Sequence, residues 1–138
     1  MSYKRFDIVI NAFNRLGLPL KIFGIGPALD SLRDQARPNI EFVGRVTDEE
    51  RSRLYQGAAA FINPQLEDFG ITAIESMSAG RPVIAYAAGG ALETVQENVT
   101  GSFFKEQTWE NLLDAVLHFT PEKFDPAVIA AHAEKFSV

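Results

Sequence analysis

Two glutamates, Glu67 and Glu75, flank the segment of this sequence that is best suited to bind an electron-rich ligand. Between them, Phe69, Gly70 and Ile71 are expected where a strand leads into a helix, so their backbone N–H groups have no partner within that helix. With the helix dipole, such groups favour a phosphate or another electron-rich oxygen, and glycine lets the ligand approach the backbone. Glu67 is placed to accept hydrogen bonds from sugar hydroxyls, and Glu75, one turn into the helix, to hold a second diol.

A structural role for Glu75 is the competing interpretation. Thr72 to Glu75 has the spacing of a capping box, in which a hydroxyl and a carboxylate three residues later satisfy the first backbone N–H groups of a helix. In that case Glu75 would only close the start of the helix. The spacing alone leaves both roles open.

A glycine pair, Gly24 and Gly26, marks a second candidate loop. The pair begins like a dinucleotide-binding fingerprint, but Leu29 stands at the third glycine position. A tight turn into a helix explains the pair equally well. No ribose-binding acid is evident at the end of the next strand, so NAD is not the preferred ligand.

Other chemistries have little support in the residue pattern. His118 and His132 are far apart in helical segments, and without cysteine they make no metal-ligand spacing, so packing or surface roles are expected for them. Neither a Gly-x-Ser-x-Gly elbow nor a Walker loop is present. Lys4 and Arg5 are either a phosphate grip or a solvated terminus, and residues 48–51 are interpreted as a solvated helix face.

Short apolar segments alternate with helical patterns along the chain. Strands are expected at 20–24, 40–44, 59–64, 82–86 and 101–104, and the main helices at 8–16, after the capping box that starts at Thr47, and at 71–79, 109–117 and 126–135. This order predicts an α/β fold, a Rossmann-like parallel sheet with helices on both faces, in one domain covering residues 1–138. Ligands of such sheets bind beyond the carboxyl ends of the strands, here the loops at 24–26, 44–46, 63–70 and 87–90.

Composition excludes several classes of protein. The chain has 138 residues, 46% of them hydrophobic and 22% charged, which suits one globular domain. Its net charge of −5 gives no broad basic surface for nucleic acid. The absence of cysteine, of a signal peptide and of any apolar run near the roughly 20 residues of a membrane span favours a cytoplasmic location.

Several motifs in order resemble the group 1 (family 4) glycosyltransferases, retaining enzymes of the GT-B fold. The resemblance covers nearly the whole chain, and the spacing of the two glutamates is the hallmark of that family. The segments that carry it are residues 42–46 (FVGRV), 58–64 (AAAFINP), 67–75 (EDFGITAIE) with 76–85 (SMSAGRPVIA), 89–93 (GGALE) and 100–101 (TG).

The resemblance implies a role for each candidate residue. Glu67 would contact the transferred sugar, and Glu75 the ribose hydroxyls of a nucleotide-diphospho-sugar, the GDP- or UDP-linked donor substrate. Lys4 would neutralise the diphosphate, no metal or other cofactor being expected. The remaining donor contacts implied are the backbone of Phe69, Gly70 and Ile71 at the sugar and phosphate, Arg45 and Val46 at the nucleobase, and the turn of Gly24 and Gly26.

Departures from the family suggest that this chain is the C-terminal donor-binding half of a larger enzyme. The family domain begins with a central strand ending in an arginine that binds phosphate, and neither is present here. The acceptor domain is absent too, so no transfer by this chain alone is expected. Exposed strand edges would then be repaired by homodimerisation or by a segment shifting into the gap. Many relatives act at the cytoplasmic membrane face, which implies a peripheral location for the parent enzyme.

The sugar and the reaction class leave alternatives. Residues 3–7 (YKRFD) are reminiscent of mannosyltransferases within the family. A sugar-nucleotide epimerase with the same fold would carry further acids and histidines around the site, and none are evident. A non-catalytic Rossmann-like binding module would not need both Glu67 and Glu75.

Overall fold

A computed structural model describes residues 5–65 and 71–136 of the protein. Along the chain, these residues form α1 (Phe6–Leu16), β1 (Leu20–Phe23), α2 (Pro27–Arg33), β2 (Ile40–Gly44), α3 (Asp48–Gly57), β3 (Phe61–Asn63), α4 (Ile71–Ser78), β4 (Val83–Tyr86), α5 (Ala91–Thr94), β5 (Gly101–Phe104), α6 (Trp109–Leu117) and α7 (Pro126–Ala133). Two short 3-10 turns, η1 (Pro121–Lys123) and η2 (Glu134–Phe136), complete the order. The five strands and the main helices lie where the sequence predicts them, although the last helix ends at Ala133 and continues as η2.

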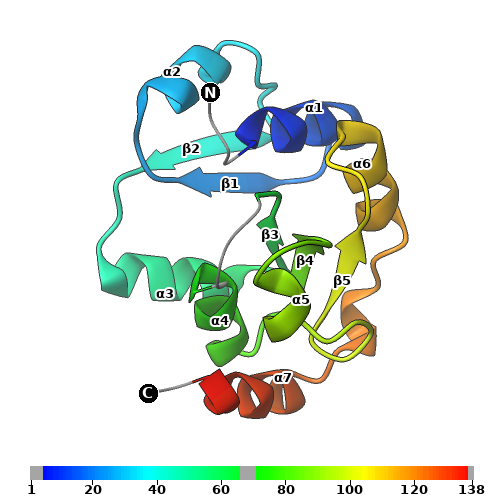
Figure 1. Ribbon diagram of the computed structural model, residues 1–138. Helices are drawn as coiled ribbons and strands as arrows, with labels where there is room; N and C mark the ends of the chain where they lie inside the picture. The colour runs from blue at the N-terminus through cyan, green and yellow to red at the C-terminus, as the bar shows by residue number, and fades with distance from the viewer. Residues whose placement is uncertain (1–4, 66–70, 137–138) are drawn as a thin grey trace.

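The strands are parallel, but they form two sheets. β1 pairs with β2, and β3, β4 and β5 pair in that order. In Figure 1 the β1–β2 sheet lies above the other sheet, with its strands running roughly crosswise to β3–β5. The parallel α/β fold is therefore confirmed. Within the described ranges no segment pairs between β1 and β3, so the predicted shift of a segment into the gap is not seen.

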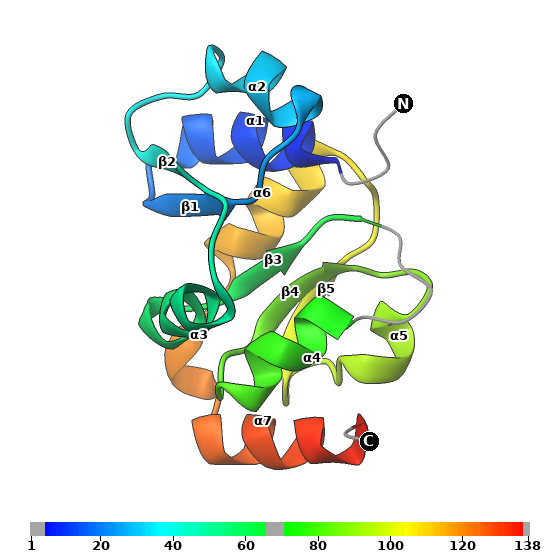
Figure 2. The same cartoon turned by 90° about the vertical axis from the view of Figure 1, so that its left-hand side faces the viewer.

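Helices cover both faces of the β3–β5 sheet, as predicted. Side chains of successive strand residues point to opposite faces, and β4 shows the consequence. Ile84 belongs to a core with α1 and α6, whereas Val83 and Ala85 belong to a second core with α4 and α7. Figure 2 shows α4 and α7 on one side of this sheet.

The first core also joins the two sheets. Ile22 of β1 and Ile40 of β2 are buried in the same cluster as Ile84 and Phe104 of the β3–β5 sheet. The same core includes α1, whose Ile8, Val9, Ile10, Ala12 and Phe13 are all buried. A shared apolar core thus connects sheets that exchange no ladder hydrogen bonds.

Capping residues fix the helix that follows β2. Thr47 accepts from the backbone N–H of Glu50 at 3.1 Å, and the Glu50 carboxylate accepts from the backbone N–H of Thr47 at 3.0 Å. The predicted capping box is confirmed and sets the start of α3. Within residues 5–65 and 71–136, no helix has the length and apolar character needed to cross a bilayer.

Candidate functional site

The loops after β1 and β2 lie together, as predicted from their position at the carboxyl ends of the strands. The Gly24 N–H donates to the Gly44 carbonyl at 2.8 Å, so the two strand ends are tied directly before the loops begin. Gly24 and Gly26 have φ of 112° and 154°, which L side chains rarely adopt. Glycine is favoured at both positions by these backbone angles and not by lack of space, because a Cβ at either would meet no atom within 4 Å.

Arg45 and Val46 continue directly from β2 into the capping box of α3. Arg45 is exposed and Val46 is half-buried. Their backbone lies next to the Gly24–Gly44 hydrogen bond, so the structure brings together the predicted nucleobase contact and the predicted glycine turn.

Glu75 faces α3. Its Oε2 lies 3.1 Å from Nη2 of Arg51, which also lies 2.9 Å from Oδ1 of Asp48. Ile71 and Thr72 both belong to α4, so Thr72 lies inside the helix and is not its N-cap, and the capping-box role considered for Glu75 is wrong. The prediction that residues 48–51 form a solvated face is also wrong for Arg51, whose side chain is only 30% exposed.

An open pocket of about 350 Å³ lies between α3 and α4 at this ion pair. Both helices contribute polar groups to it, and the buried ring of Tyr55 forms part of its apolar wall. Its lining residues are Asp48, Arg51, Ser52, Tyr55, Glu75, Ser78 and Ala79. A concave surface with charged groups of both signs fits a polar ligand with hydroxyl groups.

The other predicted site residues are placed only in part. Ile71 belongs to α4. Lys4, Glu67, Phe69 and Gly70 lie outside the described residues, and their roles stay predictions. Among the described residues no group of three or more His, Cys, Asp or Glu side chains is arranged to hold a metal ion.

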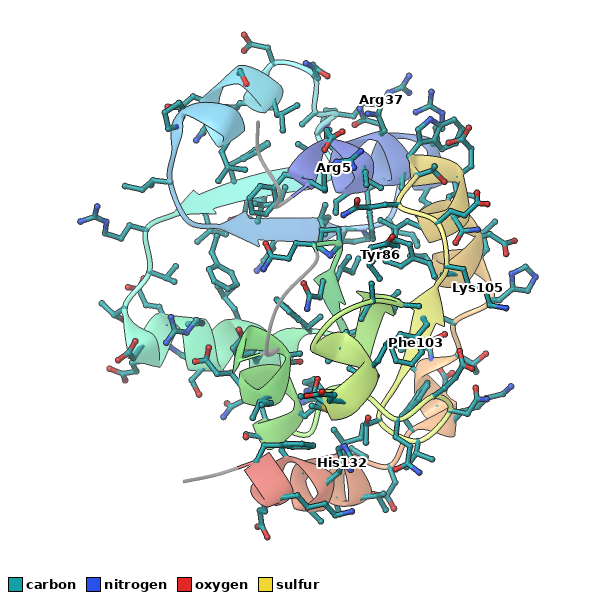
Figure 3. All side chains as sticks on the ribbon, viewed as in Figure 1. Arg5, Arg37, Tyr86, Phe103, Lys105 and His132 are labelled. Atoms are coloured by element: carbon teal, nitrogen blue, oxygen red, sulfur yellow. The ribbon has the colours of Figure 1, made fainter. Side chains whose placement is uncertain are left out.

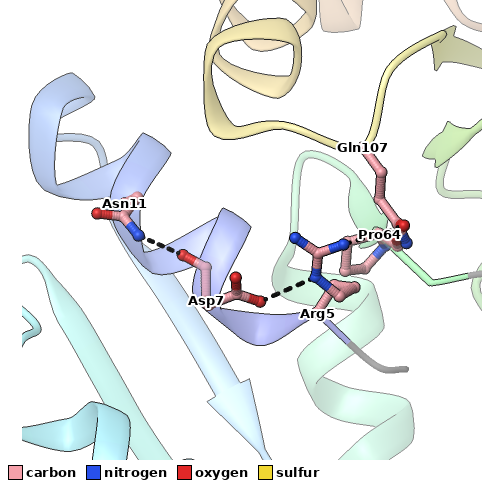
Figure 4. A network of polar contacts seen from close by, with 5 residues as sticks. All are labelled: Arg5, Asp7, Asn11, Pro64 and Gln107. Atoms are coloured by element: carbon pink, nitrogen blue, oxygen red, sulfur yellow. Dashed lines mark hydrogen bonds and ion pairs between the residues drawn. The ribbon is translucent and has the colours of Figure 1, made fainter. Parts of the chain in front are cut away.

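A polar network that the sequence analysis missed joins three segments near these strand ends (Figure 4). Nη1 of Arg5 donates to Oε1 of Gln107 at 3.1 Å, and Nε2 of Gln107 donates to the Pro64 carbonyl at 2.9 Å. Nε of Arg5 also donates to Oδ1 of Asp7 at 3.3 Å. Arg5 has a left-handed backbone with φ of 54°, unusual for a residue with a side chain, and the network holds it there. Neither interpretation of Arg5 from the sequence, as a phosphate-binding residue or as part of a solvated terminus, predicted this contact, because Gln107 is 102 positions away.

The histidines have the structural roles that were predicted. His118 contacts the Asp114 carbonyl at 2.8 Å on the surface, and a ring nitrogen of His132 lies 2.8 Å from the Thr94 carbonyl. Figure 3 shows His132 on the far side of the β3–β5 sheet from Arg5. Trp109 packs against the first core, with the Arg15 guanidinium 3.9 Å from its ring centroid.

The one resolved shift in acidity within the described residues belongs to Glu50. Hydrogen bonds to its carboxylate, first from the backbone N–H and then from the side chain of Thr47, lower the pKa of Glu50 from its ordinary value of 4.5. This shift reflects the helix cap and lies outside the pocket.

Comparison with known proteins gives one consistent family. The model of the family described as "Glycosyl transferases group 1" matches residues 1–135 of this chain. The chain is 32% identical over 131 residues to a glycogen synthase of Mycoplasma mobile, covering 83% of this chain and 28% of that protein. It is 35% identical over 113 residues to a GDP-mannose-dependent alpha-(1-6)-phosphatidylinositol monomannoside mannosyltransferase of Mycobacterium tuberculosis, covering 72% and 29%. The chain therefore spans less than a third of the length of these relatives.

Solved structures show the same fold. A sucrose-phosphate synthase from Thermosynechococcus elongatus superposes with a TM-score of 0.81 at 23% identity, covering 96% of this chain and 37% of that one. Anabaena HepE in complex with UDP-glucose superposes with a TM-score of 0.79 at 24% identity, covering 99% and 41%. At these identities the likeness concerns the fold alone.

Proposed function

Because this chain belongs to the group 1 glycosyl transferases, we propose that it is the donor-binding domain of an enzyme that transfers a hexosyl group from a nucleotide-diphospho-sugar to an acceptor. The proposed reaction retains the configuration at the anomeric carbon, and the proposed sugar is mannose. The mannosyl assignment is supported by the GDP-mannose-dependent relative and by a second relative, an O-antigen chain mannosyltransferase C of Escherichia coli.

The observation that carries the proposal is the position of Glu75 in the pocket between α3 and α4. The carboxylate is held by an arginine and is 34% exposed, so it remains accessible to hydroxyl groups of a ligand. The loops of Gly24, Gly26, Arg45 and Val46 lie at the carboxyl ends of β1 and β2, where parallel α/β proteins bind nucleotides. The complex of HepE with UDP-glucose supports a nucleotide-sugar as the ligand.

The proposed residue roles are those that the resemblance to the family implies. Glu75 binds the ribose hydroxyls, and the backbone of Arg45 and Val46 contacts the nucleobase. The backbone N–H of Ile71 at the start of α4, together with the proposed contacts of Phe69 and Gly70, binds sugar and phosphate oxygens. Lys4 compensates the negative charge that grows on the diphosphate as it leaves, which is the electrostatic stabilisation a metal ion would otherwise supply. Glu67 contacts the transferred sugar.

The proposed enzyme has further parts and a cytoplasmic location. An acceptor-binding domain completes the active site, so this chain alone is expected to bind donor without transferring sugar. The parent enzyme contacts the membrane surface from the cytoplasm. For the isolated chain, homodimerisation through β1 and β3 is proposed, since in the described part of the chain each of these strands pairs on one side only. Sedimentation velocity across a hundredfold range of concentration tests this, and a monomer throughout would contradict it.

Calorimetric titration of UDP, GDP, ADP and their sugar conjugates tests the donor-binding function. One nucleotide series should bind, and Glu75→Gln should weaken it by about tenfold or more, because an amide presents only one acceptor oxygen to a diol. Glu110→Gln, an exposed change on α6, is the matched control and should bind normally. Binding of none of these nucleotides by a folded protein would refute the proposal.

Product analysis separates the reaction classes. With the parent enzyme, which includes the acceptor-binding domain, transfer from GDP-mannose with an α-linked product, seen by NMR, would support a retaining mannosyltransferase, whereas an inverted linkage would refute retention. Conversion of the nucleotide-sugar to its epimer without an acceptor would favour the epimerase alternative. Unchanged affinity in both Glu67→Gln and Glu75→Gln would favour a non-catalytic binding module.

A further inference from the structure

An ion pair between α3 and α4 connects Glu75 to Arg51, a residue without an expected role. Nη2 of Arg51 lies 3.1 Å from Oε2 of Glu75 and 2.9 Å from Oδ1 of Asp48. The Arg51 and Glu75 side chains are 30% and 34% exposed, whereas Asp48 is 96% exposed. Arg51 therefore meets one carboxylate within the pocket and another at its rim, and its pair with Glu75 is better shielded from water than an ordinary surface pair.

This pair restricts the Glu75 side chain before any ligand binds. A glutamate side chain has three rotatable bonds, and fixing them on binding costs conformational entropy. When a neighbouring arginine already holds one carboxylate oxygen, the side chain loses this freedom during folding. Ligand binding then loses less conformational entropy, and its free energy is more favourable. The orientation is set as well, because a guanidinium donates along fixed directions in its plane.

The helix that carries Arg51 is itself well fixed. The capping box of Thr47 and Glu50 sets the start of α3 at Asp48, in the same first turn that carries Arg51. At the other end of α3, Nη2 of Arg81 donates to the Gln56 carbonyl at 2.5 Å, which ties α3 to the segment between α4 and β4. Arg51 thus approaches Glu75 from an element that is anchored at both ends.

On the basis of the proposed donor-binding function, we propose that Arg51 is a positioning residue that orients the Glu75 carboxylate for the ribose hydroxyls of the nucleotide. Arg51 acts through Glu75 and determines how strongly the pocket distinguishes a ribonucleotide from one without these hydroxyls. Asp48, on the solvent side, contacts the same guanidinium nitrogen of Arg51 and helps to hold it in place.

The test measures selectivity for the ribose hydroxyls. Affinities for the nucleoside diphosphate that binds among UDP, GDP and ADP, and for its 2′,3′-dideoxy form, are compared by calorimetry. The unaltered protein should prefer the ribonucleotide by about tenfold or more, since each lost hydroxyl removes a hydrogen bond to the charged carboxylate. Arg51→Met, which keeps a long helix-favouring side chain, should reduce this preference to about threefold or less. Arg53→Met, exposed on the same helix, is the matched control and should keep the full preference.

Further variants show whether Arg51 acts through Glu75. The double variant Arg51→Met/Glu75→Gln should show no less preference than Glu75→Gln alone, because Arg51 acts on the ligand only through Glu75. Arg51→Lys keeps the charge but not the forked geometry, and should retain an intermediate preference. It also provides the measurement if Arg51→Met does not fold.

The outcomes separate this inference from the function on which it rests. If Glu75→Gln abolishes the preference and Arg51→Met leaves it unchanged, the positioning role is overturned while donor binding stands. If Arg51→Met weakens both nucleotides equally, Arg51 contacts another part of the ligand or supports the fold, and the positioning role is again overturned. If the unaltered protein has no preference for the ribose hydroxyls, the proposed role of Glu75 fails first.

Discussion

The β1–β2 sheet and the β3–β5 sheet contribute to one candidate site but are packed very differently. In β4, three of four residues are buried between helices on both faces, whereas β1 and β2 each bury a single residue, Ile22 and Ile40. The turn of Gly24 and Gly26 and the loop of Arg45 and Val46 extend from the lightly buried sheet, and Glu75 lies on a helix packed against the densely buried one. A ligand at this site would therefore contact a densely buried half and a lightly buried half, and substitutions in the first should be the more destabilising.

Replacing a glycine by alanine should lower the free energy of unfolding much more in one half than in the other. A Cβ at Gly101 in β5 would lie 2.1 Å from the Val83 carbonyl oxygen and 2.8 Å from a Val95 methyl, so Gly101→Ala should cost on the order of 4 kcal/mol in unfolding free energy. Gly24→Ala meets no atom and loses only its favoured backbone conformation, about 2 kcal/mol. Urea unfolding measures both, and equal costs would contradict the comparison.

A matched pair of valines tests burial directly. Val83 of β4 is fully buried, and Val83→Ala should cost about 2 to 3 kcal/mol through lost apolar burial and a cavity. Val43 of β2 is half-buried, and Val43→Ala should cost about 1 kcal/mol. Urea midpoints with unchanged slopes give the two values. A larger loss at Val43 would show that the β1–β2 sheet is the more tightly packed one.

The Arg5–Gln107–Pro64 network joins the start of α1 to the ends of the β3–β5 sheet and should have an intermediate effect. Gln107→Ala removes both side-chain hydrogen bonds and should cost about 1 to 2 kcal/mol. Gln107→Glu keeps the contact with Arg5 but has no N–H for Pro64, so its stability should fall between that of the unaltered protein and that of Gln107→Ala. Gln96→Ala, at an exposed position, serves as the control in the same thermal melts. Equal stabilities of Gln107→Ala and this control would show that the network does not contribute to the stability of the protein.

The smallest effect concerns Glu50 in the cap of α3. Its pKa is lower in the folded protein than its ordinary value of 4.5, so its contribution to stability is present above that value and is lost as pH falls through the lowered pKa. Glu50→Ala should therefore be slightly destabilising at pH 7, and this difference should shrink toward pH 3. A difference that grew at acid pH would mean that the protonated carboxyl is the favoured form.

Local patterns predicted the elements because their causes are local. The capping box at Thr47 and the apolar runs of the strands act over a few residues, and each appears where expected. The role of Glu75 was left open by spacing, because Thr72 to Glu75 fits a capping box as well as a ligand site. The position of Thr72 inside α4 and the partner of Glu75 on α3 removed the first alternative.

Contacts between distant segments had no local signal. Arg51 seemed part of a charged, solvated helix face, and only the packing of α3 beside α4 turned it toward Glu75. Gln107 carried no motif at all, and it acquired a role because the loop after β5 passes close to Pro64 and Arg5.

The strands, the helices, their parallel α/β order and the loops at which a ligand should bind could all be predicted from the sequence, because periodicity, caps and turns depend on neighbouring residues. The division of the strands into two sheets over a shared core, and the contact of Arg51 with Glu75, emerged only in the folded protein. Those outcomes depend on which surfaces meet when helices pack on sheets, and that geometry is set by the whole chain rather than by any one segment of it.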